Sequence, residues 1–314
     1  MSFEPVTTSS PLPPPVVAAY HYCHSVAEQH ARNFSYGARL VPAPKRRALT
    51  AVYAFARRVD DIGDGRLDPA AKEERLSATR ALLERVRDGA VQQDDTDPVA
   101  VALGDAARRY PIPLGALDEL IDGVLMDVRG HTYETWDDLR VYCTRVAGTI
   151  GRLSLGVFGV LPGAREAERA PEYADTLGLA LQVTNILRDI REDAANGRVY
   201  LPAEDLRKFG CPEGPGLAGP GPESDFTGLI RFQVRRAREL FAEGSRLLPM
   251  LDRRSGACVT TMAGIYHRLL DRIEADPRAV LRHRVTLPAG HKILVAARGL
   301  TGLDARRAAR RERL

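Results

Sequence analysis

Two segments, YAFARRVDDIGD (residues 53–64) and QVTNILRDIRED (residues 182–193), place oxygen-bearing side chains four residues apart in apolar surroundings. These side chains are Asp60 and Asp64 in the first segment and Asn185, Asp189 and Asp193 in the second. Side chains at positions i and i+4 lie one above the other on one face of a helix. The spacing therefore predicts two helices, each with a row of acidic groups along one face.

Apolar neighbours indicate what these acidic rows face. Phe55 and Val59 flank the first row, and Ile186 and Leu187 flank the second. A carboxylate inside an apolar pattern points at a core or a cavity, where its charge must be paired or bound to a metal. The alternative is solvated helix surface, which accounts for one acidic segment alone better than for both together.

A divalent cation is the partner that two facing acidic rows predict. Mg2+, for which Mn2+ can substitute, takes oxygen ligands and bridges carboxylates to the phosphates of a substrate. Arg57, Arg58 and Arg188 lie beside the acids, and guanidinium groups pair well with phosphate oxygens. We therefore expect metal-dependent chemistry on a phosphate in a cavity between two helices.

The hydrophobic periodicity predicts helix almost throughout the chain from Val16 onward, with no strand-like alternation. The predicted helical segments are 45–60, 71–88, 98–109, 114–128, 137–160, 171–194, 225–248 and 256–275. Asp97–Pro98, and Thr135 with Asp138, have the pattern of helix N-termini. Residues 211–225 are rich in Gly and Pro, so we expect a surface loop or a linker beside a lid there.

The 314 residues, 44% of them hydrophobic, are enough for one large all-α domain. We assign residues 1–15, which include PLPPP, to a disordered leader, residues 16–300 to the helical domain and residues 301–314 to a basic tail. The four cysteines are far apart, which disfavours a disulfide framework or a zinc site. Neither a signal peptide nor an apolar run of membrane-spanning length is visible, so we expect a cytoplasmic protein.

The basic tail ends in RRAARRERL (306–314). A solvated tail is the simplest interpretation, and contact with anionic lipid on the inner face of the membrane is the functional one. Nucleic acid is disfavoured as a partner, because its binding normally uses a broader basic face with interleaved aromatic residues.

One predicted helix, YCTRVAGTIGRLSLGVFGV (142–160), is rich in small residues. Each glycine inside a helix costs about 1 kcal/mol relative to alanine, so a reason for the glycines is needed. Close packing against another helix and a smooth wall beside a long apolar ligand are both compatible with the pattern.

Five ordered motifs resemble those of the squalene/phytoene synthase family, the head-to-head prenyl diphosphate synthases. They are ARNFSYGARLVP (31–42), YAFARRVDDIGD (53–64), YCTRVAGTIG (142–151), QVTNILRDIREDAANGRVYLP (182–202) and MAGIYHRLLDRIE (262–274). The resemblance covers about residues 20 to 300. It implies a single isoprenoid-synthase helical bundle with a central cavity.

The resemblance also implies roles for residues that match the family motifs. The implied metal ligands are Asp60, Asp61, Asp64, Asn185, Asp189 and Asp193. The implied substrate-binding residues are Asn33, Tyr53, Arg57, Val146, Ile150, Gln182, Arg188, Tyr200, Tyr266 and Arg284. Tyr142, Arg57 and Arg188 are the implied catalytic residues, the tyrosine as a proton acceptor for which the released diphosphate is the alternative. Asn33, where many members have serine, and Arg145, where a smaller residue is usual, depart from the motifs.

Within the family, the motif sequences taken together are most similar to those of the presqualene diphosphate synthases of bacterial hopanoid pathways. This implies head-to-head condensation of two farnesyl diphosphates with Mg2+, without a requirement for NADPH, and transfer of the product to a downstream squalene-forming enzyme. The alternatives within the family are phytoene synthesis from two geranylgeranyl diphosphates and squalene synthesis with NADPH reduction. A catalytically silent scaffold protein is disfavoured because all the motif acids are present.

Overall fold

The computed structural model describes residues 11–30, 32–288, 290–292 and 295. Every regular element in those ranges is a helix, which confirms the predicted all-α class. The helices are α1 (Pro14–His30), α2 (Arg32–Ala38), α3 (Ala43–Asp64), α4 (Pro69–Arg87), α5 (Pro98–Arg109), α6 (Gly115–Val128), α7 (Trp136–Cys143), η1 (Thr144–Gly148), α8 (Thr149–Phe158), η2 (Ala167–Arg169), α9 (Ala170–Ala195), α10 (Ala203–Lys208), η3 (Gly214–Ala218), α11 (Phe226–Gly244), η4 (Ser245–Met250), α12 (Arg253–Ala275) and α13 (Ala279–Arg282).

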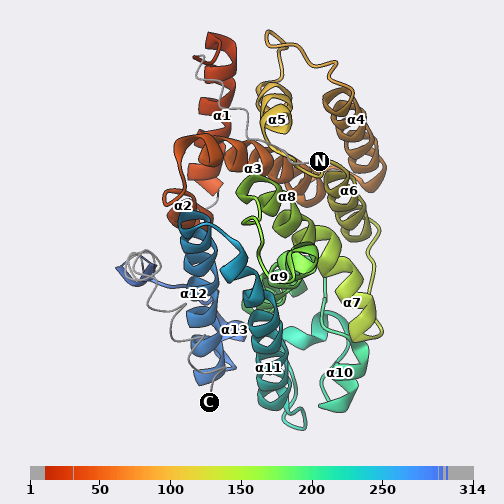
Figure 1. Ribbon diagram of the computed structural model, residues 1–314. Helices are drawn as coiled ribbons and strands as arrows, with labels where there is room; N and C mark the ends of the chain where they lie inside the picture. The colour runs from red at the N-terminus through yellow and green to blue at the C-terminus, as the bar shows by residue number, and fades with distance from the viewer. Residues whose placement is uncertain (1–10, 31, 289, 293–294, 296–314) are drawn as a thin grey trace.

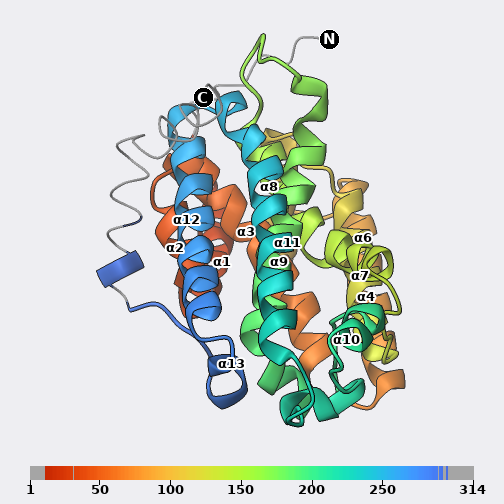
Figure 2. The same cartoon turned by 90° about the horizontal axis from the view of Figure 1, so that it is seen from below.

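Helix α9 lies in the middle of the bundle in both views (Figures 1 and 2). It contacts α7, α8, α11, α12 and α13, and its buried residues occur on all sides of the helix. A helix that is apolar all round is one that neighbours enclose on every side. The second acidic segment therefore lies on a helix at the centre of the bundle.

Helix α3 packs against α1, α5 and α6, with α4 covering α5 and α6 on the outside (Figure 1). Its beginning is anchored by Lys45, whose ammonium group donates to the carbonyl of Phe158 at 2.6 Å and to Asp252 at 2.7 Å. A third contact, 3.2 Å long, joins it to the hydroxyl of Ser255 at the start of α12. These contacts hold the helix that carries the first acidic segment.

Glycines bring α9 close to the η1–α8 segment. A Cβ added at Gly178 of α9 would lie 2.3 Å from the carbonyl oxygen of Ala147, and one at Gly151 would lie 2.2 Å from that of Ala174. Close helix packing thus explains these small residues. The predicted helix 137–160 is interrupted by η1, a single π-helical turn of a kind that is frequent at functional sites.

Both predicted N-terminal caps are present. Asp97 accepts from the backbone N–H groups of Val99 and Ala100, and Thr135 forms a capping box with Asp138. The helix predicted over 225–248 ends at Gly244 and continues to Met250 as the 3₁₀ helix η4, which contains Pro249. Proline cannot continue an α-helix because it lacks the N–H that the carbonyl one turn earlier needs.

The ends of the domain differ partly from the expected boundaries. Helix α1 begins at Pro14, so residues 14 and 15 of the expected leader are helical, as the missing N–H of proline permits in a first turn. Residues 1–10 and the tail 301–314 lie outside the described residues. The Gly/Pro-rich segment 211–225 contains η3, which packs on α9 through the buried Leu217. In the part of the chain that the structure describes, no helix has the length and apolar character needed to cross a membrane.

Candidate active site

The two acidic segments line one cavity of about 350 Å³ between α3, α6, the α7–η1 segment and α9. The residues after α9 close one side of it. The described residues around the cavity are Arg57, Asp60, Gly63, Asp64, Val124, Asp127, Tyr142, Val146, Gln182, Asn185, Ile186, Arg188, Asp189, Asp193, Arg198 and Tyr200. The convergence expected from the i,i+4 spacing is therefore present in the fold.

Asp60 and Asp64, from the last two turns of α3, differ in their surroundings. Burial, together with the nearby charge of Asp64, raises the pKa of Asp60 to about 7. Asp64 is more exposed and accepts a hydrogen bond of 2.8 Å from the guanidinium of Arg198. In the first acidic row, Asp60 is therefore readily protonated near neutral pH, and Asp64 is held in an ion pair with Arg198.

The second acidic row runs along α9. Asp189 pairs with Arg188 at 2.5 Å, and burial with the charge of Asp189 raises the pKa of Asp193 to about 7. The Oδ1 atom of Asn185 is buried and has no hydrogen-bond partner among the residues that the structure describes. A buried oxygen without a donor indicates a ligand that would complete it.

Asp127 of α6 is a half-buried acid that lines the same cavity as the two rows. It accepts the phenol hydroxyl of Tyr142 at 2.7 Å and that of Tyr200 at 2.9 Å. The rings of these tyrosines lie 5.2 Å apart, centre to centre, and Tyr133 packs against both. Burial raises the pKa of Asp127 and raises that of Tyr142 well above its ordinary value, so the phenol stays protonated.

The sequence did not single out Asp127, Arg198, Gly63, Val124 or Ile186 as site residues. Asp127 is one carboxylate within GVLMDV, where no repeated spacing marks it, although a lone acid in an apolar helix is itself a signal. Arg198 lies within the NGRVYLP part of a quoted motif. Its side chain can be placed only once the turn after α9 is known.

Six predicted site residues lie outside the lining of this cavity, within the described part of the chain: Asp61, Tyr53, Asn33, Ile150, Tyr266 and Arg284. Asp61, an expected metal ligand, is turned away from Asp60 on α3. Successive side chains are turned by about 100° on a helix, so Asp61 cannot share the direction of Asp60. It is 53% exposed and pairs with Arg57 at 2.5 Å. Arg58, an expected phosphate partner, instead pairs with Asp97 at 2.7 Å on the side toward α5.

The other five extend the site beyond the cavity to differing degrees. Tyr53, one turn before Arg57, stacks on Phe34 with ring centres 5.4 Å apart, next to Asn33 on α2. The Oδ1 of Asn33 is buried without a partner among the described residues. Ile150 lies one turn beyond Val146 and is half-buried.

Tyr266 and Arg284 lie beside Arg188 and Asp189. Burial opposes the charge of Arg188, but hydrogen bonds to Asp189 and Tyr266 outweigh it and raise the arginine pKa. Arg284 pairs with Asp189 at 3.0 Å and with Glu192 at 3.4 Å. The late arginine expected from the motif HRVTLP is therefore brought to the second acidic row.

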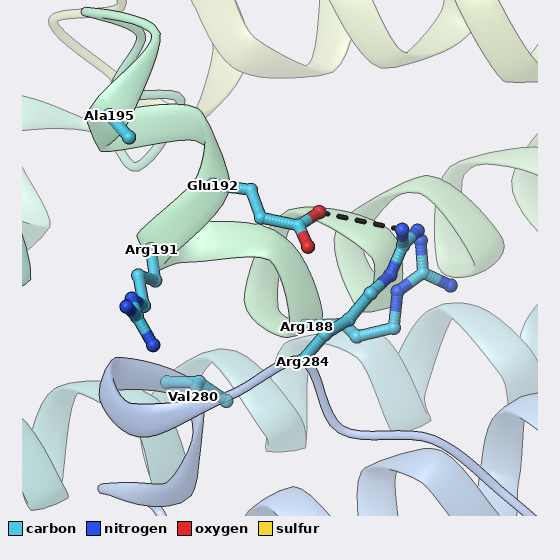
Figure 3. A pocket seen from close by; sticks show the side chains of 6 residues that line it. All are labelled: Arg188, Arg191, Glu192, Ala195, Val280 and Arg284. Atoms are coloured by element: carbon cyan, nitrogen blue, oxygen red, sulfur yellow. Dashed lines mark ion pairs between the residues drawn. The ribbon is translucent and has the colours of Figure 1, made fainter.

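A second pocket of about 280 Å³ adjoins the main cavity, with Arg188 in the lining of both. Figure 3 shows Arg188 and Arg284 extending to the same place, beside the carboxylate of Glu192. Arg191 lines the other side and donates to the carbonyl of Arg282. Positive charge thus borders the second acidic row on the side of α13.

The charges around the main cavity fit a divalent cation. Among the described residues, five carboxylates and three arginines line it, so its net charge is −2 when all are ionised. A diphosphate would be repelled by that charge unless cations entered as well. The unpartnered oxygen of Asn185 and the carboxylates of Asp60 and Asp193, whose pKa values are raised by burial and by neighbouring acids, are oxygen ligands of the kind that Mg2+ or Mn2+ takes.

The two raised pKa values predict how pH and Mg2+ affect stability together. Asp60 and Asp193 have pKa values of about 7 in the folded protein against an ordinary 3.8. The folded state therefore holds protons that the unfolded state has released, and this contribution to stability is lost as pH rises through 7. Mg2+ at this site would need the carboxylates to be ionised, so it is expected to raise Tm by about 2 °C or more at pH 8.

At pH 6 the increase in Tm should be smaller, because protons compete with Mg2+ for the same oxygens. Thermal unfolding followed by circular dichroism at both pH values, with and without Mg2+, measures the difference. The variant carrying Asp60→Asn and Asp193→Asn serves as the control, in which the pH dependence of the Mg2+ effect should disappear. An increase in the wild type that is the same at both pH values would contradict the assignment.

Comparison with known proteins gives consistent results. The family model described as squalene/phytoene synthase matches residues 27–291. A phytoene synthase from Mycobacterium tuberculosis is 45% identical over 284 residues, which is 90% of this chain and 90% of that protein. Among solved structures, squalene synthase HpnC from Alicyclobacillus acidocaldarius is 31% identical, with a TM-score of 0.74 over 87% of this chain and 98% of that chain.

A dehydrosqualene synthase in complex with a ligand has a TM-score of 0.79 with 24% identity, over 92% of this chain and 98% of that chain. At that identity the likeness concerns the fold alone. Together with the HpnC structure, it confirms the predicted class of helical bundle.

Proposed function

Because the chain belongs to the squalene/phytoene synthase family, we propose that it joins two geranylgeranyl diphosphates head to head to form phytoene. The observation that carries this proposal is the 45% identity to a phytoene synthase over nine-tenths of both chains. The motifs alone favoured farnesyl diphosphate and presqualene diphosphate. Those motifs surround the diphosphates, which all members share, so they contain little information about the length of the hydrocarbon tail.

Residues of both acidic rows are suited to hold the diphosphates together with Mg2+. Asp60, Asp64, Asn185, Asp189 and Asp193 would hold the metal, which when bound supplies positive charge to departing diphosphate. Arg57 and Arg188 line the same cavity and bind phosphate oxygens. Because their guanidinium groups are already in place, they stabilise the negative charge as the C–O bond breaks without rearranging.

The cluster of Asp127 with its tyrosines accepts one proton, and the released diphosphate accepts the other. Joining two C20 diphosphates into phytoene releases two diphosphates and two protons, and the carbocation must be kept from water meanwhile. The oxygen of Tyr142 takes up a proton while its own proton passes along the 2.7 Å hydrogen bond to Asp127. Burial raises the pKa of Asp127, which makes its carboxylate a better acceptor than an exposed aspartate.

The product formed from each substrate tests the proposal. With Mg2+ and without NADPH, we expect geranylgeranyl diphosphate to give phytoene, with two diphosphates released for each product molecule. The value of kcat/KM for farnesyl diphosphate should be lower, because its shorter hydrocarbon tail would bury less apolar surface when bound. Product identification by chromatography and mass spectrometry measures both, with added EDTA as the control that abolishes turnover.

A second candidate is supported by the structure of HpnC, which is a squalene synthase. In that case farnesyl diphosphate would be preferred, with presqualene diphosphate or, given NADPH, squalene as the main product. That result would overturn the phytoene proposal. Peripheral contact with the inner face of the membrane, and transfer of the product to a downstream enzyme, follow from the lipophilic product in either case and are part of the same proposal.

A further inference from the structure

Arg198 lines the cavity from the segment that follows α9. The chain reverses at Asn196 and Gly197, where Gly197 has a φ of 75°, a conformation that glycine adopts without strain. The N–H of Arg198 then bonds to the carbonyl of Asp193 at 2.8 Å. This turn aims the Arg198 side chain back over the cavity.

The guanidinium of Arg198 links the segment after α9 to the end of α3. One Nη donates to Asp64 at 2.8 Å and the other lies 3.4 Å from the carbonyl of Gly63, both at the end of α3. The side chain is 24% exposed, whereas that of Asp64 is 64% exposed. Its charge also acts on Asp127 and Asp193. The positive charge of Arg198, which follows the second acidic row, thus offsets the negative charge of Asp64 in the first row.

The segment that carries Arg198 is fixed on both sides, whereas the side chain itself is long. Tyr200 is hydrogen-bonded to Asp127, and the N–H of Ala203 bonds to the carbonyl of Tyr133 at 2.9 Å. The backbone therefore stays in place when the Asp64 pair breaks. The guanidinium can then turn toward an anion in the cavity that it lines.

We propose that Arg198 is an internal counter-ion that holds Asp64 while the metal is absent and binds the diphosphate once metal has displaced it. The proposal rests on the proposed function in that it takes a diphosphate as the ligand, although it does not depend on the length of the tail. A divalent cation and a guanidinium repel each other at the same carboxylate, so binding of one disfavours the other. A phosphate beside both relieves that repulsion, because it pairs with each.

The proposal predicts opposite effects on two ligands. Without substrate, Arg198→Gln is expected to bind Mn2+ about fivefold more tightly, the effect of removing one partly exposed ion pair that competes with the metal. With saturating Mn2+, the same variant is expected to bind inorganic pyrophosphate about tenfold more weakly, because it has lost one charged hydrogen-bonding partner. Electron paramagnetic resonance of free Mn2+ and calorimetry with pyrophosphate measure the two affinities.

Two further variants make the result decisive. Arg129→Gln removes an arginine that also makes a 2.8 Å ion pair, with Glu73 outside the cavity, and both affinities should stay at the wild-type value. Arg198→Lys keeps the charge and should bind Mn2+ like the wild type. A loss of both affinities in Arg198→Gln would show a merely structural role, and an unchanged Mn2+ affinity would remove the counter-ion role.

These affinities are independent of the product experiment. A preference for farnesyl diphosphate would overturn the phytoene proposal and leave the role of Arg198 intact. Opposite effects on Mn2+ and pyrophosphate would support that role with either substrate.

Discussion

Replacing Asp127 with asparagine is expected to lower kcat by about 100-fold or more while the helical bundle stays folded. The carboxylate accepts hydrogen bonds from two phenols, Tyr142 at 2.7 Å and Tyr200 at 2.9 Å. An asparagine amide offers one oxygen and one NH2 group, so one hydroxyl loses its acceptor. The variant also lacks the group that receives the proton from Tyr142. The loss should therefore appear in kcat, with a smaller effect on KM.

Asp105→Asn is the matched control for this prediction. Asp105 of α5 is a buried carboxylate that likewise accepts a tyrosine hydroxyl, that of Tyr20 at 2.8 Å, and it lies outside the cavity. This variant should lose stability through its bonds to Tyr20 and Arg109 and keep its kcat. Steady-state kinetics on both variants, with urea unfolding alongside, separates the two effects. Wild-type turnover in a folded Asp127→Asn protein would rule out the proposed proton acceptor.

The variant Gly178→Ala is expected to lose about 3 kcal/mol of folding stability, although it adds a single methyl group. The new Cβ would lie 2.3 Å from the carbonyl oxygen of Ala147 and 2.7 Å from the nitrogen of Gly148. Both are backbone atoms of η1, and no rotamer change can move them. The added methyl would separate α9 from the π-helical turn that follows Tyr142 and contains Val146, so activity should fall as well.

Gly104→Ala provides the comparison, because Gly104 also lies inside a helix. The nearest atom to a Cβ there is a guanidinium nitrogen of Arg108 at 3.7 Å, which is ordinary contact. Alanine should be neutral at this site or stabilise the protein by about 0.5 kcal/mol, since it restricts the unfolded chain. Urea unfolding gives the free energy of each variant. Similar stabilities for Gly178→Ala and Gly104→Ala would mean that α9 can move away from η1 at little cost.

The helices α3 and α9, and the meeting of their acidic faces, could be predicted because they follow from local spacing. The row of Asn185, Asp189 and Asp193 has the helical period, and the apolar residues around it place it against a core. Asp97 and Thr135 could be identified as caps for the same reason, since capping depends on a few adjacent residues.

Other parts of the site depend on packing between distant segments. Asp127 becomes a site residue because Tyr142 and Tyr200 approach it from α7 and from the segment after α9. The π-helical turn forms where Gly178 lets two backbones meet. Neither has a local sequence pattern. Asp61 is the reverse case, because the motif includes it whereas its side chain pairs with Arg57 and is absent from the cavity lining.

The contacts of Lys45 have a consequence for how the protein is made. This residue lies in the first turn of the helix that carries the first acidic row, yet its partners Asp252 and Ser255 lie 207 and 210 residues later in the chain. A ribosome delivers the N-terminal end first, so α3 emerges long before its anchor. Contacts of such long range also form slowly, because a large loop must close first. The cavity therefore cannot take its final shape during synthesis until the start of α12 has left the ribosome.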